Sequence, residues 1–61
     1  MPIVTVEWLE GRTAEQKQAV AERITAAVAE DGRTDASGVL VLFRDVPPGD
    51  WAAGGSLVQA P

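Results

Sequence analysis

The 61-residue chain contains no cysteine and no histidine. The first absence excludes disulfides and thiolate metal ligands, and the second excludes an imidazole general base. Five basic against nine acidic residues give a net charge of −4, so the basic surface typical of nucleic-acid binding is missing. No apolar run approaches the roughly 18 residues that a membrane-spanning helix needs, and the N-terminus lacks a signal-peptide pattern. We therefore expect a cytoplasmic protein that binds neither nucleic acid nor membrane and needs no metal or cofactor.

The length of the chain suffices for one domain only, and we expect residues 1–61 to form it. A domain of about 60 residues buries only about 60% of the surface of its unfolded chain, so an isolated monomer is marginally stable. Small proteins usually compensate with disulfides, a metal or oligomerisation. Because nothing in the sequence suggests the first two, self-association is the remaining route.

Three successive segments have the patterns of a strand, a helix and a strand. Residues 2–9 are rich in β-branched residues that alternate between two faces. Thr13 and Gln16 match the capping box that opens a helix, which we predict over 14–31. Residues 39–43 are apolar on both faces, as in a strand that is buried on both sides. This order predicts an α/β fold, namely a β-α-β unit with parallel strands and a right-handed crossover.

One helix can cover only one face of a two-stranded sheet. The second face of the apolar strand at 39–43 therefore needs a cover that this chain does not supply. Another copy of the chain is its simplest source.

The last part of the chain has the composition of a loop and a turn. The PPGD sequence at 47–50 predicts a loop, because proline fixes φ and donates no hydrogen bond. Within 51–58, the Gly54-Gly55 pair between small and apolar residues predicts a short hairpin.

Pro2 is the residue with the most distinctive potential chemistry. If Met1 is removed during synthesis, the Pro2 nitrogen becomes a free secondary amine. An α-amino group titrates near pH 7.7–8.0, and apolar surroundings disfavour its cation. A neutral amine is a competent general base or imine-forming nucleophile. From Pro2 alone, the alternative that it merely begins a strand, where proline is tolerated, is favoured.

Several motifs taken together resemble the 4-oxalocrotonate tautomerase family, from Pro2 to about Leu57. In order, they are Pro2-Ile3, LEGRT at 9–13, EQK at 15–17, and the VPP, Trp and Gly-Gly residues at 46–48, 51 and 54–55. The resemblance implies a β-α-β subunit that dimerises through its sheets and usually assembles as a hexamer of three dimers. It also implies a cofactor-independent tautomerase, whose mature amino-terminal proline moves a proton in an enol or unsaturated 2-keto acid.

The resemblance also assigns roles to individual residues. Pro2 falls on the catalytic proline, and Arg12 falls on an arginine that binds a substrate carboxylate. The backbone amide of Leu9 falls where the family polarises the substrate carbonyl. Trp51 replaces a phenylalanine wall and makes it bulkier. The family's second arginine, which engages the 2-keto acid end of the substrate, falls on Leu40.

The leucine at this position predicts a changed substrate. A dicarboxylate such as 2-hydroxymuconate fits less well than a monocarboxylate or a smaller enol. Arg44 lies four residues beyond Leu40 on the same face, about 13 Å away at 3.3 Å per residue, and we expect it to form an ion pair or an inter-subunit contact.

Three alternatives stay open at the level of the sequence. The first is related chemistry that depends on Pro2, as in a decarboxylase, a hydratase or dehalogenase, or an imine-forming enzyme. The second is a hetero-oligomer whose partner chain supplies the missing charge. The third is a non-catalytic oligomeric subunit. The presence of leucine at position 40, where the family has its second arginine, favours this alternative.

Overall fold

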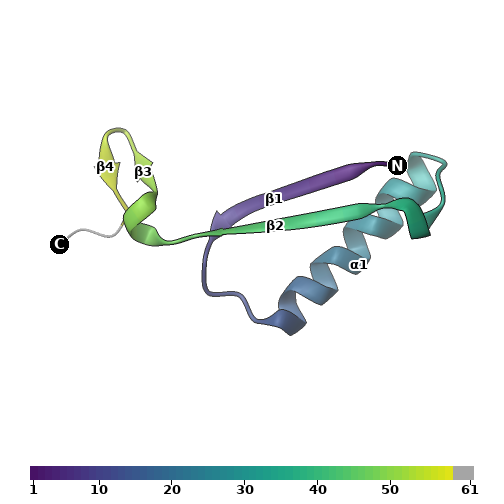
Figure 1. Cartoon of the computed structure of the whole chain (residues 1–61), viewed down its shortest axis with the longest axis horizontal. Coiled ribbons are helices and arrows are strands. Elements are labelled where there is room, and N and C mark those ends of the chain that lie inside the picture. Colours follow the sequence, from purple (N-terminus) through teal and green to yellow (C-terminus); the bar gives the residue numbers. More distant parts are fainter. Residues whose placement is uncertain (59–61) are drawn as a thin grey trace.

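The computed structural model describes residues 1–58 and shows a β-α-β unit followed by a hairpin (Figure 1). Strand β1 (Ile3–Leu9), helix α1 (Ala14–Asp31) and strand β2 (Leu40–Val46) follow one another, and β1 pairs with β2 in parallel. The predicted α/β fold with parallel strands is confirmed. Residues 59–61, which the expected single domain includes, lie outside the described residues.

Helix α1 has the bounds that its capping residues predict. The Thr13 hydroxyl accepts a hydrogen bond from the Gln16 backbone N–H at 3.1 Å, and the Gln16 side chain accepts one from the Thr13 backbone N–H at 2.9 Å. At the other end, the Gly32 N–H donates to the Val28 carbonyl at 2.9 Å. A Cβ at Gly32 would lie only 2.4 Å from that carbonyl oxygen, so glycine fits this cap without a backbone shift.

Strand β2 is longer than the sequence predicts, since it continues past residue 43 through Arg44, Asp45 and Val46. The register places Ile3 opposite Leu40 and continues without a break to the end of both strands. Each strand of the sheet is therefore seven residues long. Pairing with β1 satisfies backbone groups of Arg44 and Asp45 as well, and this outweighs the low strand propensity of Asp45.

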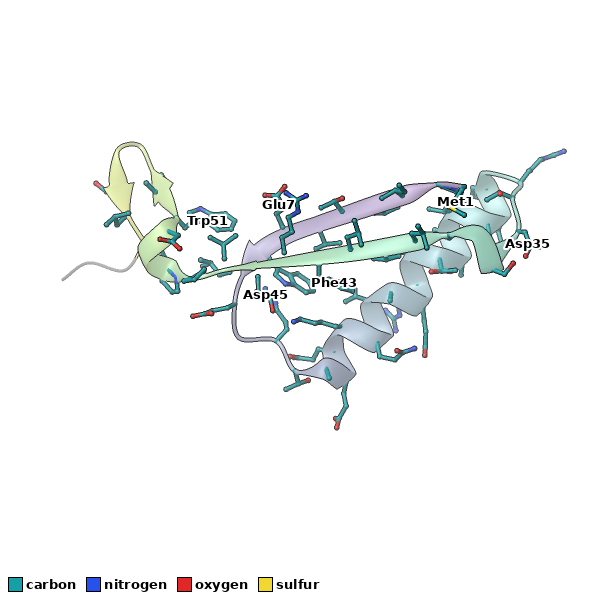
Figure 2. All side chains as sticks on the ribbon, viewed as in Figure 1. Met1, Glu7, Asp35, Phe43, Asp45 and Trp51 are labelled. Carbon is teal, nitrogen blue, oxygen red and sulfur yellow. The ribbon has the colours of Figure 1, made fainter. Side chains whose placement is uncertain are left out.

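The two faces of the β1–β2 sheet have different surroundings. Helix α1 covers the face that carries the half-buried residues Val4, Val6, Trp8, Val41 and Phe43. The opposite face is uncovered and is called the open face below. Its residues are Ile3, Thr5 and Glu7 from β1 and Leu40, Leu42 and Arg44 from β2. Figure 2 shows Phe43 and Asp45 on the side of α1, and Glu7 on the other side.

The open face confirms that one helix leaves half of the sheet uncovered. Ile3, Leu40 and Leu42 are 61%, 42% and 47% exposed, and no residue in 1–58 is fully shielded from water. The radius of gyration is 14.7 Å, whereas a compact domain of this length has about 10.5 Å. A single chain therefore leaves one face of its sheet uncovered, has an extended shape and does not enclose a core.

The C-terminal hairpin is the second reason for the extended shape. Strands β3 (Ala52–Ala53) and β4 (Ser56–Leu57) pair in antiparallel fashion, which confirms the predicted hairpin. Gly54 and Gly55 both have positive φ, 60° and 86°, as the tight turn of a two-residue hairpin loop requires. The expected loop before it contains a short 3₁₀ turn, Pro48–Asp50. The hairpin projects away from the sheet, opposite to the N-terminus (Figure 1).

Candidate active site

Pro2 and Leu40 lie side by side at the amino end of the sheet. The Leu40 N–H donates to the Pro2 carbonyl at 2.9 Å, and Leu40 is the register partner of Ile3. Pro2 is half-buried, and Met1 is 89% exposed. Met1 therefore makes little contact with the rest of the chain, and its removal would leave the Pro2 amine at the amino end of β1.

Leu9 and Arg12 lie at the opposite end of β1. Gly11, with φ of 130°, turns the chain out of the strand, in a conformation that other residues rarely adopt. The Arg12 Nη1 donates to the Leu9 carbonyl at 2.8 Å, and its guanidinium carbon lies 4.4 Å from the centre of the Trp8 ring. Arg12 is thus held by one hydrogen bond and one cation–π contact.

Trp8 is fixed in turn by its neighbours on the helix side of the sheet. Its ring stacks on Phe43 with 5.3 Å between centroids, and its Nε1–H donates to Asp45 at 2.7 Å. Lys17 of α1 forms an ion pair with the same carboxylate. These donors hold the pKa of Asp45 below its ordinary value of 3.8, chiefly through the hydrogen bond from Lys17 and then through that from Trp8.

The lowered pKa of Asp45 predicts a pH dependence of stability. Folding favours the carboxylate, so its contribution is present above the unfolded-state pKa and is lost as the pH falls through the folded-state pKa. We expect Asp45→Asn to lower the free energy of unfolding at neutral pH and to flatten the decline of stability below about pH 4. Urea denaturation across this pH range measures both effects, with Asp50→Asn as the control. Parallel stability profiles for Asp45→Asn and the unchanged chain would contradict the prediction.

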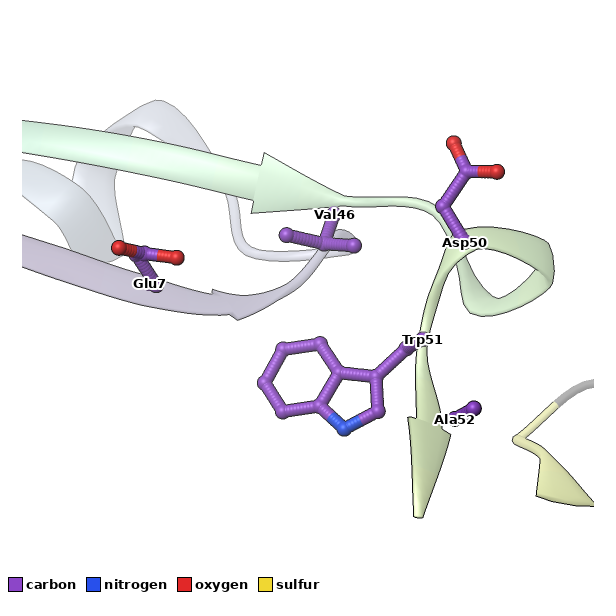
Figure 3. A pocket seen from close by; sticks show the side chains of 5 residues that line it. All are labelled: Glu7, Val46, Asp50, Trp51 and Ala52. Atoms are coloured by element: carbon purple, nitrogen blue, oxygen red, sulfur yellow. The ribbon is translucent and has the colours of Figure 1, made fainter. Parts of the chain in front are cut away.

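Trp51 forms one wall of an open depression between the hairpin and the sheet. The depression has a volume of about 280 Å³ and is lined by Glu7, Val46, Asp50, Trp51 and Ala52. Figure 3 shows the indole projecting toward the end of the sheet, on the side where Glu7 lies. The half-buried indole offers an apolar surface, and the carboxylates of Glu7 and Asp50 give the depression negative charge.

The structure therefore separates the predicted site residues into two groups. Pro2 and Leu40 lie at the amino end of the sheet, whereas Leu9, Arg12 and Trp51 lie at or beyond its carboxyl end. The seven residues of β1 span about 23 Å between these ends. One chain does not bring Pro2 to Arg12 or Trp51.

A second depression lies between the end of β1 and α1, and reasoning from the sequence missed it. It has a volume of about 390 Å³, and its lining residues are Trp8, Arg12, Gln16, Ala19, Val20 and Arg23. Arg23 was not among the predicted site residues. Its spacing of seven residues from Gln16 places the two on the same face of the helix, but Gln16 was itself predicted only as a capping residue, so this spacing did not mark a site.

Two further classes of feature are absent from residues 1–58. No group of three or more acidic side chains lies close enough together to hold a metal ion in this part of the chain. In the same described range, α1 is too polar to cross a membrane.

Comparison with known proteins identifies the family. The sequence profile described as "Tautomerase enzyme" matches residues 2–60. The chain belongs to the tautomerase family. It is 44% identical over 57 residues to a "probable tautomerase" of Ralstonia nicotianae, covering 93% of this chain and 88% of the relative. It is 40% identical over 55 residues to the 2-hydroxymuconate tautomerase of Comamonas testosteroni, covering 90% and 87% of the two chains.

Solved structures of tautomerases have the same fold. A 4-oxalocrotonate tautomerase homologue superposes with a TM-score of 0.90 at 33% identity, over 95% of this chain and 92% of the homologue. A heterohexameric 4-oxalocrotonate tautomerase from Chloroflexus aurantiacus J-10-fl superposes with a TM-score of 0.88 at 33% identity, over 95% and 94% of the two chains. The resemblance inferred from the sequence is thus confirmed, and this enzyme is a tautomerase with a β-α-β fold.

Proposed function

We propose that this tautomerase moves a proton in an enol or unsaturated 2-keto acid, with Pro2 as general base and general acid after the removal of Met1. The observation that carries this proposal is the family match beginning at residue 2, a proline whose nitrogen becomes a free secondary amine. The amine takes a proton from one position of the substrate and returns it to a carbon. Because substrate and product are isomers, the reaction needs no further reactant.

Arg12 is the proposed ligand of a substrate carboxylate. Its planar guanidinium matches a carboxylate with two parallel hydrogen bonds, which a lysine cannot do. The hydrogen bond to Leu9 and the Trp8 ring already orient this side chain, so little rotamer entropy is lost on binding. The Leu9 backbone amide donates to the substrate carbonyl, and Trp51 provides an apolar wall.

The proposed site is assembled from at least two copies of the chain. The distance along β1 prevents Pro2 and Arg12 of one chain from touching one small substrate. The open face has exposed leucines at Leu40 and Leu42, which a second copy would cover. We infer self-association, with a hexamer of three dimers as the proposed state, and the heterohexameric structure from Chloroflexus aurantiacus J-10-fl supports this inference.

The apolar residue beside Pro2 defines the proposed substrate. Leu40 lies next to Pro2 and cannot bind a carboxylate, and apolar neighbours favour the neutral form of an amine. We infer a monocarboxylate enol as substrate, because a second carboxylate near Leu40 would lose its hydration without gaining a partner.

Rates on two enols test this function. We expect kcat/KM for phenylenolpyruvate, which has one carboxylate, to exceed that for 2-hydroxymuconate by about tenfold, equivalent to about 1.4 kcal/mol. Leu40→Arg should reduce this preference, because it supplies a partner for the second carboxylate. Ketonisation followed by absorbance measures both rates. A preference for 2-hydroxymuconate that Leu40→Arg leaves unchanged would contradict the proposed substrate.

A second candidate function is a subunit of a hetero-oligomer whose partner chain supplies the missing arginine. The observation that favours it is the same leucine, Leu40, beside Pro2. In that case the purified chain, with Met1 removed, would ketonise neither enol until the partner chain is added.

A further inference from the structure

We propose that Arg23 and Arg12 together form a two-guanidinium carboxylate site above the indole of Trp8. This inference rests on the proposed function, in which Arg12 binds the substrate carboxylate, and adds a second arginine that determines which acids bind. Its ligand class is a small unsaturated or aromatic carboxylate.

The fold places both arginines at one depression. Gln16, Ala19, Val20 and Arg23 are spaced i, i+3, i+4 and i+7, so they form one stripe along α1. This stripe and the end of β1 enclose the depression of about 390 Å³ that Trp8 and Arg12 also line. Arg23 thus reaches, from the helix, the same space that Arg12 reaches from the loop.

The depression has the charge and the donors of an anion site. None of its six lining residues is acidic. Asp45 attracts Arg12 electrostatically, but the Asp45 carboxylate already accepts hydrogen bonds from Lys17 and Trp8. Arg12 donates to the Leu9 carbonyl with one of its five N–H groups. Within residues 1–58, Arg23 forms no hydrogen bond or ion pair with another side chain.

The remaining walls explain why the ligand is not a bare inorganic anion. Trp8, Ala19 and Val20 give the depression an apolar floor between the two arginines. An apolar surface next to charged donors suits a molecule with a carboxylate at one end and an unsaturated or aromatic body. Two guanidiniums around one carboxylate would also offset the substrate affinity that is lost because position 40 holds a leucine and not an arginine.

Tryptophan fluorescence tests this site without relying on turnover. The chain has two tryptophans, so Trp51→Phe leaves Trp8 as the sole reporter. With cinnamate as the probe, we expect Arg23→Gln in this background to weaken binding about five- to tenfold. Arg23→Lys should restore part of the loss. Arg33→Gln, which removes an exposed arginine outside the depression, should leave the dissociation constant unchanged.

Kinetics give a second readout that separates binding from chemistry. With phenylenolpyruvate, Arg23→Gln should raise KM by a similar factor and leave kcat nearly unchanged, because the proton transfer occurs elsewhere. Unchanged cinnamate binding by Arg23→Gln, or an equal loss with Arg33→Gln, would overturn the proposal. Pro2→Ala keeps the two failures apart: if it retains full turnover the proposed function fails, while the cinnamate titrations still decide the role of Arg23.

Discussion

Replacement of Pro2 with alanine is expected to lower kcat/KM for phenylenolpyruvate by about 10², the lower end of the range that a positioned general acid–base group contributes, because a primary amine remains at the N-terminus. We expect Met1 to be removed before alanine as before proline, so the variant would still have a free amine at its N-terminus. The comparison therefore measures the contribution of the ring amine, with the rest of the site unchanged. Stopped-flow absorbance on protein whose N-terminus has been verified by mass spectrometry gives the rates.

A second variant tests whether activity depends on the free nitrogen of Pro2 or only on the presence of the proline ring. One alanine inserted between Met1 and Pro2 keeps the proline but converts its nitrogen into an amide, which is not basic. We expect this variant to fold like the unchanged chain, since Met1 lies exposed beyond the start of β1, and to lose at least as much activity as Pro2→Ala. Pro47→Ala serves as the control for loss of a proline outside the site. Full activity of the insertion variant would exclude catalysis by the Pro2 nitrogen, whatever the result with Pro2→Ala.

The local structure of the chain could be predicted where short-range interactions decide it. Thr13 and Gln16 close the first turn of α1 through two hydrogen bonds between neighbours in sequence, so the start of the helix was readable. The end of β2 could not be predicted in this way, because Asp45 has low strand propensity and both Arg44 and Asp45 become part of the strand by pairing with Glu7 and Trp8. That pairing depends on the register between segments 37 residues apart, which no local pattern encodes.

The site residues divide in the same way. Pro2 and Arg12 were predicted as site residues through the family resemblance of contiguous motifs, and these roles stay predictions. Their positions at opposite ends of β1 follow from the length of that strand. Arg23 could not be found in this way, because a charged residue on a helix usually serves solubility. Only the position of α1 above Trp8 shows that this arginine shares a depression with Arg12.

Mixed oligomers are expected to show that two chains contribute to each site. We expect Pro2→Ala and Arg12→Gln to be nearly inactive alone and to regain activity when they are co-expressed in equal amounts. If Pro2 comes from one chain and Arg12 from another, random assembly places both intact residues together in about a quarter of the sites. The expected activity is thus about a quarter of that of the unchanged enzyme, measured on oligomers purified through two different tags.

The reciprocal mixture separates this arrangement from a site within one chain. When the double variant Pro2→Ala with Arg12→Gln is mixed with the unchanged chain, a site shared between chains again gives about a quarter of full activity. A site within one chain would instead give about half for this mixture and none for the mixture of single variants. Leu42→Glu on the Arg12→Gln chain supplies the assembly control, because a charge on the open face should prevent mixing and abolish the rescue, whereas Ala26→Glu on the exposed side of α1 should not.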